Sequence, residues 1–181
     1  GWTPKTLFTE RISGRKKVQS RVAWDDDSNV STESRIPELD LDEVYPLTAQ
    51  MRVNVLDPYS AVLRLIRHIE TKGDCTKSYE IYDGRRRNRL HFKTLGTTNL
   101  TETRPGEFVG DALICSLKFE PIGGHKIESK WRSGEKGDDD GRIKIFFGRP
   151  MQGQIVPVRV EVNSRIGTVI GRLDLRKMTV Q

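Results

Sequence analysis

The chain has 181 residues, of which 35% are hydrophobic and 31% charged, with a formal net charge of +6 and an isoelectric point near 9.4. This length fits one domain with a proper core, and the basic balance favours a polyanionic partner, either nucleic acid or an anionic membrane surface. No stretch approaches the roughly 18 apolar residues of a transmembrane helix. The two cysteines, Cys75 and Cys115, lack the spacing of a disulfide framework or a zinc site, so neither is expected.

The first 43 residues divide by charge into two segments. Residues 1–24 carry six Lys or Arg and one Glu among bulky apolar residues, whereas residues 25–43 carry eight acidic residues and one Arg. The first composition is typical of a membrane interface and the second of a flexible linker. We therefore predict a flexible basic arm and an acidic linker over 1–43, followed by a globular domain over 44–181. The alternative is an arm that folds back on the linker or docks on the core. The candidate membrane-binding residues are Lys5, Arg11, Arg15, Lys16 and Lys17.

The segment after residue 50 predicts a short strand and the one strong helix of the chain. Met51–Val55 alternates with a period of two, and Tyr59–Glu70 has apolar residues at helical spacing. Asp57 is suited to cap this helix, Pro58 to its first position and Gly73 to its end. The residues of the expected apolar face are Val62, Leu63, Ile66 and Ile69.

Basic residues concentrate on the other side of this helix and in the run that follows Gly84. Clustered guanidinium groups repel one another unless anions lie between them, and Arg is the side chain best shaped for bidentate phosphate contact. An ordinary solvated helix face is the alternative for the helical pair. The candidates for contact with a nucleic-acid complex or an anionic surface are Arg64, Arg67, Arg85, Arg86, Arg87 and Arg89.

Strand-like patterns dominate the rest of the chain. About six predicted strands and one helix favour an α+β fold, a compact single domain with an antiparallel sheet of about five or six strands packed against one main helix. Pro157 should lie at an edge or at the start of its strand. After Met51–Val55, the predicted strands are Leu90–Leu95, Ala112–Phe119, Arg142–Phe147, Val156–Val162 and Thr168–Leu175.

Two long loops are expected, from Gly96 to Gly110 and from Gly123 to Gly141. The first carries the apolar residues Leu100, Phe108 and Val109, which predict self-association with another subunit or contact with a membrane. The alternative is that they fill the core of the same chain. The second loop has the composition of a mobile segment.

No motif in the chain indicates catalysis, a metal or a cofactor. The three histidines have no nucleophile or ligand partner near them in sequence, and no phosphate-binding glycine motif occurs. Asp138–Gly141 starts like a calcium-binding loop, but the later ligands are missing. We therefore expect a binding protein, not an enzyme.

Four short segments, in this order, resemble the matrix proteins of rhabdoviruses, of the lyssavirus and vesiculovirus types. The resemblance covers roughly residues 44–178, and it rests on an ordered set of short matches. The matching segments are Val44–Leu47, Val62–Ile69, Lys93–Leu100 and Val158–Arg172.

The resemblance implies a non-enzymatic structural protein of the virion that self-associates into oligomers or filaments. Such a protein lies between envelope and nucleocapsid, on the cytoplasmic face of host membranes. It binds the anionic inner leaflet and the nucleocapsid, condenses the nucleoprotein–RNA complex and promotes assembly and budding, and the tail of the envelope glycoprotein is a further expected partner. This chain departs from the animal-virus members in lacking a PPxY motif, which puts the recruitment of host scission machinery by that route in doubt and would suit a plant or insect virus.

Two other functions fit the same charge. A single-stranded RNA-binding module would use the Arg cluster as a phosphate track, although aromatic residues, which provide stacking platforms in such modules, make up only 7% of the chain. The second is an icosahedral capsid subunit. Such subunits have jelly-roll folds, and one helix among short strands fits a jelly roll less well than it fits an α+β domain.

Overall fold

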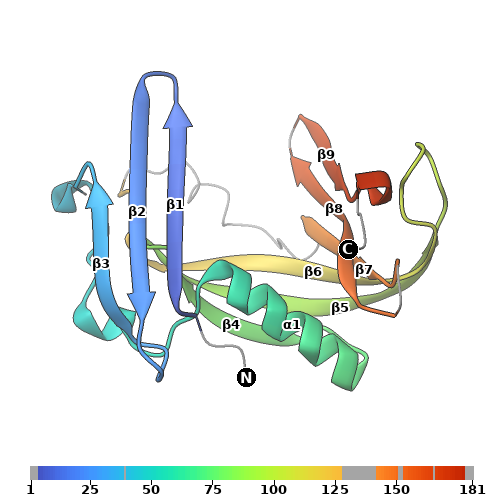
Figure 1. Cartoon of the computed structure of the whole chain (residues 1–181), viewed down its shortest axis with the longest axis horizontal. Helices are drawn as coiled ribbons and strands as arrows, with labels where there is room; N and C mark the ends of the chain where they lie inside the picture. Colours follow the sequence, from blue (N-terminus) through green and yellow to red (C-terminus); the bar gives the residue numbers. More distant parts are fainter. Residues whose placement is uncertain (1–3, 39, 128–141, 151–152, 165, 178–181) are drawn as a thin grey trace. The chain divides into compact units, whose positions relative to one another are not determined.

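A computed structural model describes residues 4–38, 40–127, 142–150, 153–164 and 166–177 of the chain (Figure 1). Within these residues the fold is α+β with one α-helix, as predicted, and it has two sheets where one was expected. One sheet has the strand order β1-β2-β3 and the other the order β4-β5-β6-β7-β8-β9. The contacts group the chain into two compact units. Unit 1 comprises Gly1–Arg64, Ser78–Leu90 and Phe119–Gly137, and unit 2 comprises Leu65–Lys77, His91–Lys118 and Asp138–Gln181.

The three-stranded sheet lies where a flexible arm and linker were predicted. Its strands, β1 (Thr6–Ser13), β2 (Lys16–Trp24) and β3 (Val30–Ile36), pair antiparallel. The long β1–β2 hairpin is plain in Figure 1. The prediction failed because charge was taken as a sign of disorder, whereas every second residue of a strand faces solvent and tolerates charge. The boundary at residue 43 is not observed either, because residues 1–64 belong to one unit.

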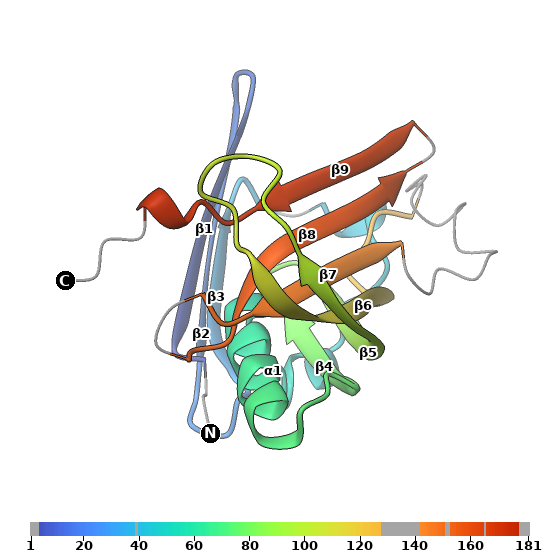
Figure 2. The ribbon, with the colours of Figure 1, turned by 90° about the vertical axis from the view of Figure 1, so that its right-hand side faces the viewer.

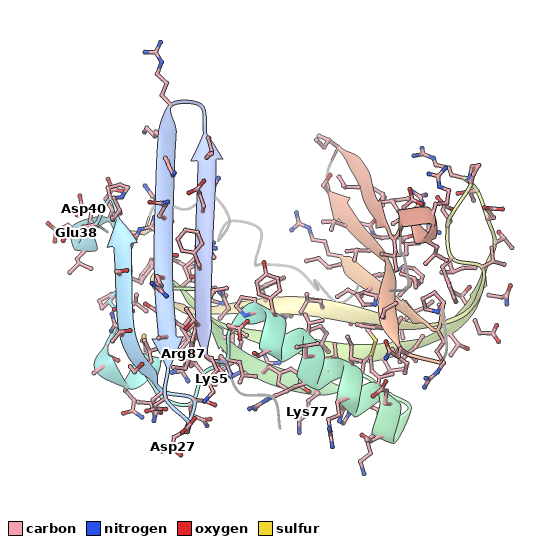
Figure 3. The ribbon with its side chains drawn as sticks, viewed as in Figure 1. Lys5, Asp27, Glu38, Asp40, Lys77 and Arg87 are labelled. Atoms are coloured by element: carbon pink, nitrogen blue, oxygen red, sulfur yellow. A yellow bond between two sulfur atoms is a disulfide. The ribbon has the colours of Figure 1, made fainter. Side chains whose placement is uncertain are left out.

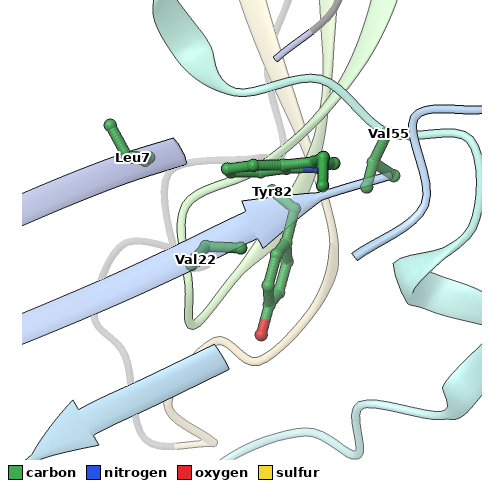
Figure 4. Packing of buried hydrophobic residues seen from close by; sticks show 5 residues of the cluster. Leu7, Val22, Val55 and Tyr82 are labelled. Carbon is green, nitrogen blue, oxygen red and sulfur yellow. The ribbon is translucent and has the colours of Figure 1, made fainter. Parts of the chain in front are cut away.

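Unit 1 has its own apolar core, which the base of this sheet helps to form. Leu7, Val22, Trp24, Val55 and Tyr82 are buried together. In Figure 4 the ring of Tyr82 lies beside Val22, with its hydroxyl directed away from Leu7 and Val55. The burial of three residues from 1–24 explains why this segment is held in the fold.

The predicted strand Met51–Val55 is absent, and the 3₁₀ helix η2 (Ala49–Arg52) covers its first two residues. A second 3₁₀ helix, η1 (Leu41–Glu43), precedes it. Local backbone bonds take the place of strand pairing, since the N–H of Met51 donates to the carbonyl of Thr48 at 3.0 Å. Asn54 then adopts a φ of 52°, which turns the chain out of the extended conformation. An alternation of hydrophobic residues over only five positions does not distinguish a β-strand from a 3₁₀ helix.

Helix α1 (Pro58–Lys72) begins and ends as predicted. The carboxylate of Asp57 accepts hydrogen bonds from the N–H groups of Tyr59 (2.8 Å) and Ser60 (3.1 Å), and Gly73 ends the helix with a φ of +76°. The apolar face is rotated from the predicted one. Its fully buried residues are Ala61, Leu65 and Ile69, whereas Val62 and Ile66 are half-buried and Leu63 is exposed.

The six-stranded sheet contains the five later predicted strands, with Pro157 near the start of its own strand. The loop expected from Gly96 to Gly110 is shorter than predicted, because the strand that precedes it continues to Leu100. Leu175 lies beyond the last strand, in the 3₁₀ helix η4 (Leu175–Lys177). The strands, shown side by side in Figure 2, are β4 (Lys77–Tyr82), β5 (Arg87–Leu100), β6 (Gly110–Gly123), β7 (Ile143–Gly148), β8 (Val156–Ser164) and β9 (Gly167–Arg172). Strand β4 was not predicted, and residues 128–141 of the second loop lie outside the described residues.

Unit 2 is built on a disulfide and a second apolar core. Cys75, which follows α1, is bonded to Cys115 of β6, with 6.2 Å between their Cα atoms. The prediction of no disulfide was wrong, because sequence spacing alone carried no information about two residues that the fold brings together. Phe108, Ala112, Phe146 and Val158 form the buried core of this unit.

No helix in the described part of the chain is both long and apolar enough to cross a membrane.

Candidate functional site

A pocket of about 490 Å³ lies in unit 2, between the end of α1 and the strands β5, β6 and β7. This volume is within the range of about 300–1,000 Å³ typical of small-molecule sites. Most of its lining is apolar. The lining residues are Ile69, Gly73, Thr97, Phe108, Val109, Gly110, Asp111, Ala112, Leu113, Phe147, Gly148, Arg149 and Ile155.

One close approach of backbone to an aromatic ring shapes a wall of the pocket. A Cβ atom at Gly148 would lie 2.6 Å from Cε1 of Phe108, so only glycine leaves room for the ring at this position. At Gly110 a Cβ atom would lie at an ordinary contact distance from the same ring, and glycine there suits the backbone φ of +131°. The wall depends on backbone shape as well as on side chains.

The charged groups of the lining are Asp111 and Arg149. Asp111 accepts a hydrogen bond from the amide of Asn99 at 2.8 Å. Arg149 donates to the carbonyl of Gly153 and, within the described part of the chain, pairs with no carboxylate. The lining thus combines an apolar wall with one cation that is available for an acidic group.

Leu100, Phe108 and Val109, predicted to mediate self-association, have different environments. Phe108 is buried in the core of unit 2, and Leu100 packs against the same core. This is the self-packing arrangement given above as the alternative. Val109 is 57% exposed and lines the pocket, so it alone of the three presents a large apolar surface to solvent.

Arg87 and Arg89, predicted to contact an anionic surface, form an ion-pair network with carboxylates of the same unit. Glu80 accepts hydrogen bonds from Arg87 Nε at 2.7 Å and from Arg89 Nη2 at 2.7 Å, and Glu120 pairs with Arg89 at 3.0 Å. Burial alone would raise the pKa of Glu80, but the hydrogen bonds from these two guanidinium groups outweigh it and lower that pKa. Arg87 lies at the start of β5 (Figure 3). The anions that separate these cations come from the protein itself.

Arg85 and Arg86 lie in the turn before β5, with Asp83 beside them. The Asp83 carboxylate accepts from the Arg86 guanidinium at 2.8 and 2.9 Å and from both backbone N–H groups. Arg85 has no such partner among the described residues. Burial, and then the charges of Arg86 and Arg35, lower the pKa of its guanidinium.

The helical pair Arg64 and Arg67 is not equivalent. Arg64 is half-buried, and its positive charge partly offsets the rise in the pKa of Tyr79 that burial causes. Arg67 is exposed on the helix surface. Arg64 belongs to unit 1, together with the run at Arg85–Arg89, whereas Arg67 belongs to unit 2.

The five predicted membrane-binding cations are all exposed on or beside the β1–β2 hairpin. Lys5 pairs with Asp26 (Figure 3 shows Lys5 at the start of β1), and Lys17 pairs with Glu10 at 2.9 Å. Two large apolar side chains, Phe8 (59% exposed) and Ile12 (68% exposed), share one face of the hairpin with Lys17.

Sequence reasoning missed the pocket and one further cation, Arg35. The pocket residues come from five separated segments, and their apolar character identified them only as core. The described residues contain no group of three His, Cys, Asp or Glu side chains arranged to hold a metal.

Comparison with known proteins gives a family and no function. No curated protein and no solved structure matches the chain. The model of one family, described as a protein of unknown function (DUF3108), matches residues 2–175. The chain therefore belongs to this family, DUF3108.

Proposed function

We propose that this protein is a non-enzymatic binding protein that holds a small amphipathic molecule in the pocket of unit 2. The observation that supports the proposal is the pocket itself, with about 490 Å³ of space and a largely apolar lining. A concave apolar site with a few polar groups is the usual form of a small-molecule site.

The lining favours a ligand with an apolar body and an acidic group. Ile69, Leu113 and Ile155 offer aliphatic contacts, and burying an aliphatic chain there is favourable by about 0.8 kcal/mol per CH₂ group. Arg149 supplies a cation without a carboxylate partner in the described residues. A medium-chain fatty acid such as dodecanoate has this chemistry and a compatible size.

The disulfide supports an oxidising compartment for this function. Cys75 and Cys115 are both fully buried, and disulfides persist in secreted and extracytoplasmic proteins but are rare in the cytosol. This favours a location outside the cytosol over the host cytoplasm suggested by the family resemblance.

Narrowing the pocket tests the proposal. Val109→Trp places a larger side chain at the rim of the pocket, and we expect it to weaken dodecanoate binding by about tenfold, measured by isothermal titration calorimetry. Val169→Trp is the matched control, since Val169 is an equally exposed residue of β9 outside the lining. Equal affinities of wild type and Val109→Trp, or no heat of binding with wild type, would contradict the proposal.

The role of Arg149 is tested separately with two ligands of the same chain length. Arg149→Gln should weaken dodecanoate binding by about tenfold, because a charge-assisted hydrogen bond is lost, and should leave dodecanol binding unchanged. A parallel loss for both ligands would show that Arg149 shapes the pocket without binding the acidic group.

A second candidate is peripheral binding to an anionic membrane through the β1–β2 hairpin, as in the matrix-type scaffold expected from the resemblance. One observation favours it: Phe8 and Ile12 are exposed on the face of the hairpin that also carries the cations Lys17 and Arg21. Exposed apolar side chains among cations suit the boundary between headgroups and acyl chains. Self-association, nucleocapsid binding and budding remain predictions of this candidate.

Flotation with liposomes tests this second candidate. Removing residues 1–24 would also remove Leu7, Val22 and Trp24 from the core, so point variants are needed. Phe8→Ser with Ile12→Ser should abolish flotation with phosphatidylserine vesicles at low salt. Val169→Ser, an exposed position in unit 2, serves as the control, and flotation that the double variant retains would exclude the hairpin.

A further inference from the structure

A cluster of cations lies in unit 1, where the β4–β5 turn meets the three-stranded sheet. The turn approaches β2 closely, because a Cβ atom at Gly84 would lie 2.8 Å from Val22 Cγ2 and 3.2 Å from Ser20 Oγ. The φ of +85° at Gly84 also favours glycine. Arg85 follows directly and is therefore held beside the face of the sheet that carries Ser20.

The same face of the sheet carries two more arginines. Ser20 lies opposite Thr9 of β1 and Arg35 of β3, and directly opposite residues of neighbouring strands place their side chains on the same face. Arg11 is two residues beyond Thr9 and shares this face as well. Arg11 and Arg35 are both close enough for their charges to act on Arg85.

A third segment closes the cluster from the end of β6. A Cβ atom at Gly124 would lie 1.8 Å from the carbonyl oxygen of Arg85, so the chain passes directly over the turn. This places His125 next to the arginines, and its ring is hydrogen-bonded to the backbone of Arg87. Two backbone hydrogen bonds fix this segment. The N–H of Gly124 donates to the carbonyl of Tyr45 at 3.0 Å, and the N–H of Tyr45 donates to the carbonyl of His125 at 2.8 Å.

Two guanidinium donors of the cluster are buried and unpaired. Nε of Arg35 and Nε of Arg85 have no solvent contact and no hydrogen-bond partner within the described residues. Two carboxylates whose charges act on Arg85 are engaged elsewhere, Asp83 with Arg86 and Glu43 with Lys126. Unpaired buried donors cost free energy, and like charges held together cost more, so a bound anion would stabilise this arrangement.

We propose that this cluster is a binding site for a phosphate-type oxyanion, with Arg35 and Arg85 as its principal ligands and Arg11 and His125 at its edge. Guanidinium groups match the geometry of a tetrahedral oxyanion and form the strongest of the common hydrogen bonds to it. The site is independent of the pocket in unit 2, so either proposal survives the failure of the other.

Thermal unfolding in sodium phosphate and in sodium chloride of equal ionic strength tests the site. Wild type should be stabilised saturably by phosphate beyond the effect of chloride, since a ligand that binds only the native state raises its stability. Arg85→Gln should weaken phosphate binding by at least about tenfold. Its melting temperature without phosphate should be equal or higher, because a repulsive charge is removed. A merely structural arginine would instead lower it.

Arg21→Gln is the matched control. Arg21 is exposed on the same sheet, and because it directly follows Ser20 in β2, its side chain lies on the face opposite to the cluster. It should retain the phosphate effect. No difference between phosphate and chloride with wild type, or equal losses in Arg85→Gln and Arg21→Gln, would overturn the site.

The phosphate group could belong to a soluble molecule or to a lipid, and a second arm of the experiment distinguishes these sources. Sedimentation with phosphatidic acid vesicles is compared with stabilisation by glycerol 3-phosphate. Binding to either that depends on Arg85 supports the site and identifies its source. Binding to neither overturns it.

Discussion

At the scale of single residues, Glu33 of unit 1 is a carboxylate whose pKa is lowered by its hydrogen-bond partners. Its carboxylate accepts hydrogen bonds from the guanidinium of Arg52 at 2.6 Å and from the hydroxyl of Tyr82 at 2.6 Å. Burial alone would raise the pKa of Glu33, but the bonds from Arg52 and Tyr82 outweigh it and lower that pKa below its ordinary value of 4.5. Burial and the Glu33 carboxylate also raise the pKa of the Tyr82 phenol.

This arrangement predicts an acid-sensitive contribution to stability. A depressed pKa in the folded state stabilises the protein above the unfolded pKa, near 4.5, and the contribution is lost as the pH falls through the folded value. Because solvent reaches the Glu33 side chain and screens its charge, Glu33→Gln should lower the free energy of unfolding at pH 7 by about 1 kcal/mol, and the difference from wild type should shrink below about pH 4. Urea unfolding at pH 7, 5 and 3.5 measures it.

Glu38→Gln is the control for this effect, since Glu38 is an exposed carboxylate just after β3 (Figure 3). Its free energy of unfolding should remain within about 0.5 kcal/mol of wild type at each pH. A difference between Glu33→Gln and wild type that is constant across the pH range would show that charge is not the cause.

At the scale of elements, the disulfide joins the end of α1 to the middle of β6 across 40 residues of sequence. Replacing both Cys75 and Cys115 by Ala should lower the free energy of unfolding by about 2–4 kcal/mol. For a chain of this size this corresponds to a fall in melting temperature of about 5–15 °C. A reducing agent should lower the melting temperature of wild type and leave the double variant unchanged. No response of wild type to reduction would contradict a stabilising disulfide.

The elements that the sequence predicted are those whose signals are local. The cap at Asp57, the stop at Gly73 and the alternation in β5 to β8 lie within a few residues of the structure they cause. The three strands of the N-terminal sheet were missed because their charged residues outnumber the few apolar ones that become buried. Leu7 and Val22 acquire their role only by packing on Tyr82, far away in the sequence.

The candidate sites could be predicted only in part for the same reason. The run at Arg85–Arg89 was visible as charge, but the sequence could not show that Glu80 and Glu120 neutralise Arg87 and Arg89 while Arg85 is left beside Arg35. The pocket depends on the close approach of the Gly148 backbone to the Phe108 ring, which hydrophobic periodicity does not reveal.

At the scale of the whole molecule, the structure describes two units with different surfaces. Unit 1 carries clustered cations on a three-stranded sheet, and unit 2 carries a disulfide and a pocket lined mostly by apolar residues. Both features serve binding, one for an anion and the other for an apolar body. The account therefore predicts that ligands of each class act on separate sets of residues.

The central claim, that unit 2 binds a small amphipathic molecule, is tested most directly by methyl NMR spectra recorded during titration with dodecanoate. The methyl signals of Ile69, Leu113 and Ile155 should shift saturably, because these residues line the pocket. Those of Val22 and Val55, in the core of unit 1, should remain in place. Unchanged signals from the three pocket residues, or equal shifts of these signals and of those from Val22 and Val55, would contradict the claim.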